Sequence, residues 1–347
     1  MSNLIVTPQI VRRIEDNLRY ILVNSWARRQ QNLWWRRVMR TRTSSTKREL
    51  LQWMLETAKI RPLDNGGRYS FEDLTEIYWE IENEKFGDAL SLTADEIADA
   101  LESPAVSGGP LDRANAWARQ IGSYGAYWPQ ERAAYLLKNG KTLTCYDNGP
   151  FFRENHPINP YIGTDSGTFT NLFLGYAFSA NNLAAITAYI RDIPGPDGVP
   201  RHLVPRIVAG GSYYQFAFNQ VLNAEWYTDP RGTGGASGAN VIKLSYNYEA
   251  PIVAPELSEP GNPWYLFCEL IEDDELGPLI YQERAPFSMN SYSPMSDVDL
   301  GLRDAFEWQF QGRNAASYGH PFLAFRIETT GERNLPEQYE ALADPEP

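Results

Sequence analysis

The spacing of apolar residues along this chain predicts several helices. In residues 8–29, apolar side chains recur every three or four positions, and Thr7 followed by Pro8 is a typical helix start. Thr93 and Glu96 have the spacing of a capping box. Pro129 separates two helical stretches, so either one helix kinks at this proline or a second helix begins there. The expected helices are 8–29, 93–101, 110–122, 129–139, 179–192 and 212–225.

Residues 75–92 alternate between apolar or aromatic residues and glutamate, which is the pattern of a strand exposed on one side. Ile77, Trp79 and Ile81 would lie on one face of this strand. Paired with the basic segment before it, the strand would form a long two-stranded excursion, which is marginally stable unless it packs on something else. Further strands are expected at 206–210, 241–248, 264–271, 279–287, 306–311 and 321–328.

Three other segments show neither the helical spacing of apolar residues nor the two-residue alternation of a strand. Residues 34–47 carry four arginines and then a polar run, so we expect an extended, solvated segment that adds little to a core. Residues 142–163 are dense in Asn-Gly, His-Pro and Asn-Pro steps and predict a buttressed irregular loop. The polar tail, 329–347, is expected to pack poorly.

The charges are divided unevenly along the chain. Residues 1–61 carry 13 Lys and Arg and 4 Asp and Glu, a net charge of +9, whereas residues 62–347 carry 18 and 40, a net charge of −22. A basic arm joined to an acidic body attracts either a polyanion or another copy of the same molecule. The acidic body is unsuited to wrapping nucleic acid, so any such contact would use the arm.

Composition places the chain among globular proteins. Its 347 residues are 43% hydrophobic, which is enough for two or three lobes. Cys145 and Cys268 are the two cysteines, so we expect no disulfide framework and a reducing compartment such as a cytoplasm. No apolar run approaches the ~20 residues of a membrane helix, and the N-terminus lacks the apolar core of a signal peptide. We therefore expect no contact with a membrane.

Candidate catalytic residues are few. A cysteine nucleophile needs a nearby base, and Cys145 with His156 is the one close pairing in the sequence. The surrounding turns explain a buried cysteine and a hydrogen-bonded histidine without reactivity. A cytoplasmic cysteine hydrolase using Cys145 is therefore kept as an alternative, and no catalytic residue is assigned.

Metal and phosphate sites find little support either. Two Cys and three His are too few and too poorly spaced for a structural zinc site. The Gly-rich loop at 232–238 lacks the Lys and Ser/Thr of a phosphate cradle, and a strand-like run follows it. The run at 297–301 departs from a calcium loop, and the acidic run at 272–275 is typical of a solvated turn. We expect no metal and no cofactor.

The aromatic residues point instead to contacts between subunits. The chain has 10 Trp and 20 Tyr, and several of them stand beside charges. Aromatic residues mixed with arginine on exposed segments are typical of protein interfaces. The candidate contact residues are Arg28, Arg29, Trp34, Trp35, Arg36, Arg37, Arg40, Arg42, Trp79, Glu80 and Glu82.

One segment resembles a known family. Residues 137–160, LKNGKTLTCYDNGPFFRENHPINP, closely resemble the signature of the Mu-type phage major head subunit, gpT, in which a helix ending in Gly leads to a Cys-Tyr-Asp, Phe-Phe and His-Pro loop. Residues 181–226 resemble the family's helix, strand and helix lobe, and 277–287 with 304–325 resemble its closing strands. The resemblance covers about 111–325, and the N-terminal segments agree in character alone.

The resemblance implies an α+β protein with the Hong Kong 97-type phage capsid fold. Such subunits have an N-terminal arm, an extended two-stranded loop, a peripheral domain with a spine helix, and an axial domain. The expected division is arm 1–33, extended loop 34–92, peripheral domain with spine helix 93–174, axial domain 175–278, return strands of the peripheral domain 279–328, and tail 329–347. The chain departs from the family in a Pro/Gly-rich insertion at 229–263 and in having no obvious N-terminal scaffolding segment.

The resemblance further implies a major capsid protein rather than an enzyme. It would self-assemble into pentamers and hexamers of an icosahedral shell that encloses double-stranded DNA without sequence-specific binding. It would belong to the virion, after assembly in the bacterial host cytoplasm with scaffold or protease and portal proteins, and with a decoration protein as a further partner. The remaining alternative is a nucleic-acid-binding module acting through the arm, which the acidic body disfavours. In a shell, the basic arm and loop would instead lie over the acidic bodies of neighbours.

Overall fold

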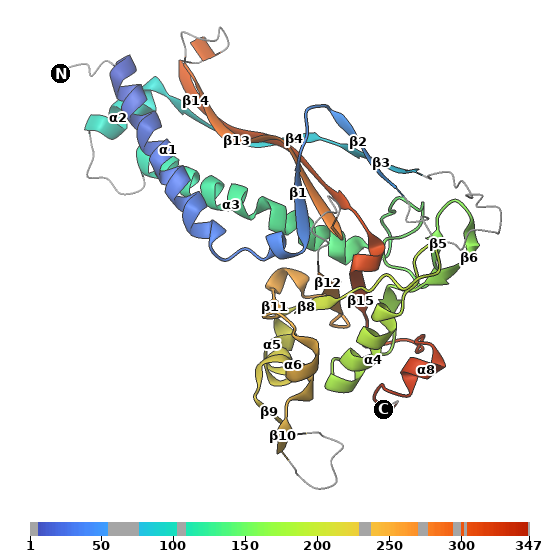
Figure 1. The fold of residues 1–347 in the computed structure, drawn as a ribbon. Helices are drawn as coiled ribbons and strands as arrows, with labels where there is room; N and C mark the ends of the chain where they lie inside the picture. The colour runs from blue at the N-terminus through green and yellow to red at the C-terminus, as the bar shows by residue number, and fades with distance from the viewer. Residues whose placement is uncertain are drawn as a thin grey trace, which may run out of the picture.

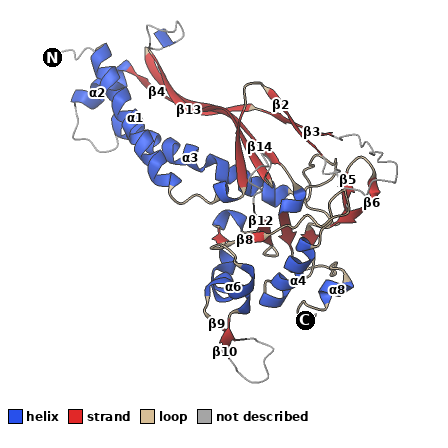
Figure 2. Cartoon of the chain, in the orientation of Figure 1, coloured by secondary structure: helices blue, strands red, loops and turns tan. Residues whose placement is uncertain are grey.

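The computed structural model describes residues 6–54, 76–102, 109–228, 237–269, 277–293, 300–301 and 304–345. Figure 1 shows an elongated upper part, in which two long helices lie beside long strands, and a smaller lobe below it that holds the C-terminus. Helices and strands are mixed along the chain, as expected of an α+β protein (Figure 2). Within the described ranges, no helix combines the length and the apolar character needed to cross a membrane.

The two long helices are α1 (Pro8–Gln30) and α3 (Pro110–Asn139). Thr7 caps α1 as predicted, because its side-chain oxygen accepts a hydrogen bond from the backbone N–H of Ile10. The helix α3 runs through Pro129 without interruption, so one helix is present where the sequence left two alternatives open.

Two glycines of α3 let α1 lie directly on it. A Cβ added at Gly122 would come within 2.5 Å of the carbonyl oxygen of Leu22, and one at Gly125 would come within 2.6 Å of the Trp26 ring. Leu18 of α1 is completely buried. The N-terminal helix is therefore packed on the body of its own chain.

The long strands form a four-stranded sheet in the order β1-β13-β14-β4. The strand β1 runs parallel to β13, whereas β14 is antiparallel to both of its neighbours. The bounds are β1 (Met39–Thr43), β4 (Glu84–Thr93), β13 (Leu279–Tyr292) and β14 (Ala305–Tyr318).

Residues 34–47 are not the solvated segment that their arginines predicted. Trp34 is buried, and so is Trp35, which opens a short 3-10 turn (Trp35–Arg37). Val38 and Met39 belong to the same buried cluster. The prediction is wrong for residues 34–39 because the two tryptophans before the arginines and the two apolar residues between them are buried in the core, and their burial outweighs the polarity of the segment.

A two-stranded excursion is present, but its partner strand differs from the prediction: β3 (Glu76–Glu82) pairs with β2 (Arg48–Met54), whereas the basic segment before β2 supplies β1 and pairs with β13. Its predicted inner face is confirmed, since Ile77 and Ile81 are buried and Trp79 packs beside Ile81. The expected single strand 75–92 is interrupted at Asn83, whose side chain donates to Ser44 and to the carbonyl of Thr46. Beyond this residue the chain continues as β4 in the four-stranded sheet.

The lower lobe is built on a five-stranded sheet in the order β11-β8-β12-β15-β7, beside α4 (Ala180–Arg191). Ser179 caps α4 as predicted, its side chain accepting from the backbone N–H of Asn182. All five residues of β12 are buried, so this strand runs through the core. The bounds are β7 (Leu172–Phe173), β8 (Pro205–Gly210), β11 (Ile252–Val253), β12 (Trp264–Cys268) and β15 (Ala324–Ile327).

The remaining elements are short. The predicted capping box is confirmed, since Thr93 and Glu96 each accept a hydrogen bond from the other's backbone N–H. The bounds are α2 (Ala94–Glu102), α5 (Gln215–Phe218), α6 (Val241–Tyr246), α8 (Glu337–Glu340), β5 (His156–Asn159), β6 (Gly163–Phe169), β9 (Trp226–Thr228) and β10 (Ser237–Ala239). Short 3-10 turns lie at Ser212–Tyr214, Pro255–Leu257 and Pro321–Leu323, and a π-helical turn lies at Asn219–Asn223.

One predicted element of the lower lobe is wrong, and another is present but less regular than expected. The expected strand at 241–248 is the helix α6, because the side chain of Asn240 accepts from the backbone N–H of Lys243 and caps a helical turn. The expected helix at 212–225 is confirmed as an unbroken helical run over 212–223, which consists of a 3-10 turn, α5 and a π turn. The acidic run 272–275, positions 297–299 and most of the Gly-rich loop lie outside the described residues.

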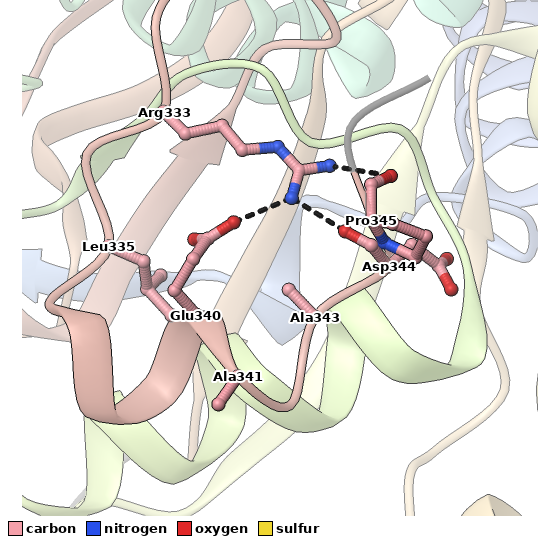
Figure 3. A pocket seen from close by; sticks show the side chains of 7 residues that line it. All are labelled: Arg333, Leu335, Glu340, Ala341, Ala343, Asp344 and Pro345. Atoms are coloured by element: carbon pink, nitrogen blue, oxygen red, sulfur yellow. Dashed lines mark hydrogen bonds and ion pairs between the residues drawn. The ribbon is translucent and has the colours of Figure 1, made fainter.

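The C-terminal tail packs closely, against the prediction. The guanidinium of Arg333 bonds the Glu340 carboxylate and the carbonyl oxygens of Asp344 and Pro345 (Figure 3). Leu335 is buried in the core of the lower lobe, together with Ala343. The prediction failed because polar groups of the tail find partners both in Arg333 and in the lobe, where Tyr339 donates to Asp192 and the backbone N–H of Asp344 donates to Asn182. Its few apolar residues can therefore reach that core.

Candidate functional site

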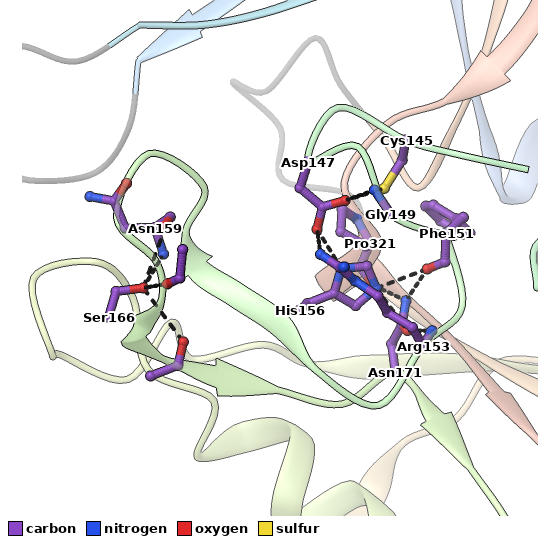
Figure 4. A network of polar contacts seen from close by, with 12 residues as sticks. Cys145, Asp147, Gly149, Phe151, Arg153, His156, Asn159, Ser166, Asn171 and Pro321 are labelled. Carbon is purple, nitrogen blue, oxygen red and sulfur yellow. Dashed lines mark hydrogen bonds and ion pairs between the residues drawn. The ribbon is translucent and has the colours of Figure 1, made fainter.

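The one close pairing of cysteine and histidine lies in the irregular loop between α3 and β5. Asp147 stands between the two residues: its Oδ1 accepts from the Cys145 thiol at 3.1 Å, and its Oδ2 lies 2.7 Å from Nδ1 of His156 (Figure 4). Cys145 and His156 are completely buried. The sequence predicted their proximity but not the carboxylate between them.

Further hydrogen bonds enclose this cluster. The guanidinium of Arg153 donates to the Asp147 carboxylate, and the Arg153 backbone N–H donates to the side chain of Asn171. Asn171 in turn donates to the carbonyl oxygens of Phe151 and Pro321. Figure 4 shows how these residues converge from the loop, from the segment before β7 and from the start of the turn before β15. The network thus fastens the loop to two distant segments.

The electrostatics keep the thiol of Cys145 protonated. Burial, together with the neighbouring Asp147 carboxylate, raises the pKa of Cys145 well above its usual range. Burial alone would raise the pKa of Asp147 too, but its bonds with His156 and Cys145 and the charge of Arg153 lower that pKa to about 2. A cysteine nucleophile reacts as the thiolate, which this arrangement disfavours. The cysteine hydrolase alternative is not supported.

The same cluster is the one group of potential metal ligands found among the described residues. The ligand atoms of Cys145, Asp147 and His156 lie within 4.8 Å of one another. Each of them already takes part in a hydrogen bond within the loop, and Arg153 places a positive charge on the carboxylate. The arrangement suits a closed structural network better than a cation site.

The predicted contact residues are spread over several elements. Arg28 and Arg29 are exposed at the end of α1, and the guanidinium of Arg29 lies 4.8 Å from the centre of the Tyr127 ring. Arg36 lies 5.1 Å from the centre of the Trp35 ring. Trp34 and Trp35 themselves are buried within their own chain, so they offer little surface to a neighbour.

Other predicted contact residues have partners within the chain. Arg37 pairs with Glu249 at 2.9 Å and donates to the carbonyl of Ala250. Glu80 and Glu82 both pair with Arg48 across the β2–β3 hairpin. The indole N–H of Trp79 donates to Ser317 at 2.8 Å. Arg40 and Arg42 lie on β1.

Large exposed apolar side chains are a feature that sequence reasoning missed. They occur on α1, on the β5–β6 hairpin and around α5 and α6, and they include Tyr20, Val23, Tyr161, Ile162, Tyr213, Phe216 and Leu244. The helical period from residue 8 onwards could have flagged Tyr20 and Val23, because both fall off its apolar face. Exposed apolar groups that lie together on a surface are typical of interaction sites.

Comparisons with known proteins identify the family. The model of the family described as Mu-like prophage major head subunit gpT matches residues 22–180 and 247–343. Among solved structures, a chain of the capsid of the cyanophage P-SCSP1u is 13% identical with a TM-score of 0.52, over 86% of this chain and 89% of that chain. A chain of the procapsid of bacteriophage JBD30 is 19% identical with a TM-score of 0.47, over 97% of this chain and 80% of that chain. No curated protein matches.

The family match spans most of the chain and includes the Cys145 loop, while the cyanophage capsid shares its fold. The predicted α+β fold of the Hong Kong 97 type is thereby confirmed. The chain belongs to the Mu-like prophage major head subunit family, gpT, and is a major capsid protein of a phage virion.

Proposed function

We propose that copies of this chain form pentamers and hexamers, that these close into an icosahedral shell around double-stranded DNA, and that the subunit performs no catalysis. Membership of the major head subunit family carries the proposal. The closed Cys145 network, with its protonated thiol, is consistent with a structural role. The large exposed apolar side chains supply surface for contacts between subunits.

The circumstances of assembly belong to the same proposal. The shell would form in the cytoplasm of the bacterial host, with a scaffold or protease and a portal, and a decoration protein could bind the finished surface. The formal net charge of −13 disfavours tight or sequence-specific binding of the enclosed DNA. The division proposed for the subunit is arm 1–33, extended loop 34–92, peripheral domain 93–174 and 279–328, axial domain 175–278 and tail 329–347.

The test is assembly of the purified chain, expressed with a scaffold if one is required. Sedimentation through a gradient followed by electron microscopy should show closed particles of uniform diameter with fivefold vertices. A chain that stays monomeric at every concentration and never gives particles would refute the proposal.

A further inference from the structure

A cavity lies where the chain turns from α1 into β1 beside α3 (Figure 1). Its volume is about 600 Å³. Small-molecule sites in proteins span roughly 300 to 1,000 Å³, so this cavity has a suitable size. Residues of α1, the 3-10 turn at Trp35–Arg37, β1, α3 and β13 line it. The described lining includes no residue of the Cys145 network, so the cavity is separate from that loop.

Aromatic rings make up much of the lining of this cavity. Trp26 of α1 and Phe287 of β13 have their ring centres 6.2 Å apart. Trp35 of the 3-10 turn and Tyr281 of β13 have theirs 5.6 Å apart. Aromatic rings bind one another in stacked or edge-to-face arrangements, so a lining with four rings favours a ligand that is itself aromatic.

The side chain of Trp35 offers an unused hydrogen-bond donor at this cavity. The residue is 5% exposed, and its buried indole nitrogen has no hydrogen-bond partner among the described residues. A buried N–H group without an acceptor is unfavourable, and nearly all such groups in folded proteins are bonded. A ligand with an acceptor oxygen would satisfy this N–H group.

The charges that line the cavity favour an anion. Arg36 and Arg40 are the cations of the described lining and Glu283 is its acid, which leaves a net charge of +1. The guanidinium of Arg36 lies 5.1 Å from the centre of the Trp35 ring, and it has no acidic partner within the described part of the chain. The indole N–H of Trp35 and the guanidinium of Arg36 are therefore two neighbouring donors, which one anionic group can bind together.

We propose that this cavity binds a small aromatic anion, of the class of an aryl sulfonate or aryl carboxylate. The ring system of the ligand lies against the four aromatic side chains, and its oxygen atoms accept hydrogen bonds from Trp35 and Arg36. A neutral aromatic molecule would leave both donors unpaired, and an aromatic cation would be repelled by the net positive charge of the lining. The site is a property of the single subunit and goes beyond the proposed shell function.

Two probes with the same rings test the preference for an anion. The first is 1-anilinonaphthalene-8-sulfonate, an aromatic anion whose fluorescence rises in an apolar site. Titrated into unassembled subunits of the full chain, it should show saturable binding. The second is N-phenyl-1-naphthylamine, which lacks the sulfonate and should bind roughly tenfold more weakly. Equal affinity for the two probes would overturn the proposal, because the two donors would then contribute nothing.

Two substitutions test the donors directly. Arg36→Gln removes an exposed cation and should weaken binding of the sulfonate roughly tenfold while changing that of the neutral probe little. Trp35→Phe keeps an aromatic ring but removes the N–H group, so it should weaken the sulfonate several-fold. The controls are Arg28→Gln, at an exposed position outside the cavity, and Trp34→Phe, which removes a buried indole N–H outside the cavity. Both controls should bind like the unaltered chain, and unchanged sulfonate affinity in Arg36→Gln and Trp35→Phe would refute the site.

A substitution that fills the cavity locates the probes independently of charge. Thr41→Trp introduces a large ring from an exposed position of β1 that lines the cavity, and it should abolish binding of both probes. Thr43→Trp, two residues further along the same face of β1 and outside the cavity, is the control. Without a probe both variants should melt like the unaltered chain, because both positions are exposed. The sulfonate should then raise the melting temperature of Thr43→Trp alone. Probe binding retained by Thr41→Trp would place the probes on another surface and overturn the proposal.

Discussion

At the scale of single residues, Asp147 contributes most to the loop between α3 and β5. Its carboxylate has its pKa lowered from 3.8 to about 2 in the fold, although burial opposes the shift, because it bonds His156 and Cys145 and lies beside Arg153. A lowered pKa means that the ionised carboxylate stabilises the fold above about pH 4, and that this contribution is lost as the pH falls towards 2. Asp147→Asn should therefore lower the free energy of unfolding at pH 7 by roughly 2 kcal/mol.

Urea denaturation of unassembled subunits from pH 7 to pH 2.5 measures this effect. The difference between the unaltered chain and Asp147→Asn should shrink as the pH falls below 4. The control is Asp165→Asn, at an exposed position of the next hairpin, which should change the free energy of unfolding little at any pH. A constant difference across this range would show that the Asp147 carboxylate is not the source of the stability.

The Asp147 network also shows which parts of a site can be predicted from sequence. Cys145 and His156 are close along the chain and are joined by turn-forming residues, so their proximity was predictable. Asn171 follows a hairpin and meets the loop only in the folded chain, so no local pattern identifies it. Its role depends on long-range packing, which a single sequence does not display.

At the scale of elements, helix caps and strand alternation predicted the structure correctly where no other local pattern or tertiary contact opposed them. The caps at Thr7 and Ser179 and the alternating face of β3 are all present. The strand expected at 241–248 failed because its apolar spacing suits either period, and the cap at Asn240 decides for a helix. Trp34 is buried although its segment is polar, because packing in the tertiary core outweighs the local composition. No helical or strand period of apolar residues marks this position in the sequence.

The contact between α1 and α3 gives a prediction for an element. In Gly125→Ala, the added Cβ would approach the rings of Trp26 and Phe310 to within 2.6 and 2.7 Å. Alanine favours a helix over glycine by about 1 kcal/mol, but overpacking costs about 1 to 3 kcal/mol and should prevail. The variant should melt at a lower temperature, and α1 should be cleaved faster by a protease because it is held less closely.

The control is Gln120→Ala, at an exposed position of the same helix, which should melt like the unaltered chain. If Gly125→Ala raised the melting temperature instead, the rings would have room to move and the close approach would not constrain α1. The contact between α1 and α3 also predicts the effect of deleting the N-terminal segment. Removing residues 1–33 would expose the apolar surface that Leu18 and Trp26 now cover, so we expect a less stable body.

At the scale of the whole molecule, Arg326 joins the upper part to the lower lobe. It lies on β15, and its guanidinium pairs with Glu259 and Glu328 at 3.0 Å. It also donates to the hydroxyl of Tyr265 and, at 3.4 Å, to the carbonyl of Leu137 in α3. Because a guanidinium has five N–H groups in a fixed plane, this one side chain satisfies acceptors on four residues.

Arg326→Met should therefore do more than remove a charge. It would leave the largely buried Glu259 without its arginine partner, whereas Glu328 would keep its pair with Lys141 at 3.0 Å, and breaking a buried pair costs about 3 to 5 kcal/mol. Arg206→Met removes an arginine whose partner, Glu269, is half exposed, so it should cost at most about 1 kcal/mol. Denaturation of unassembled subunits compares the two variants, and hydrogen exchange should show faster exchange on both sides of the junction in Arg326→Met alone. If both variants lost the same free energy of unfolding, apolar packing would hold the upper part and the lower lobe together. Arg326 would then only fill space between them.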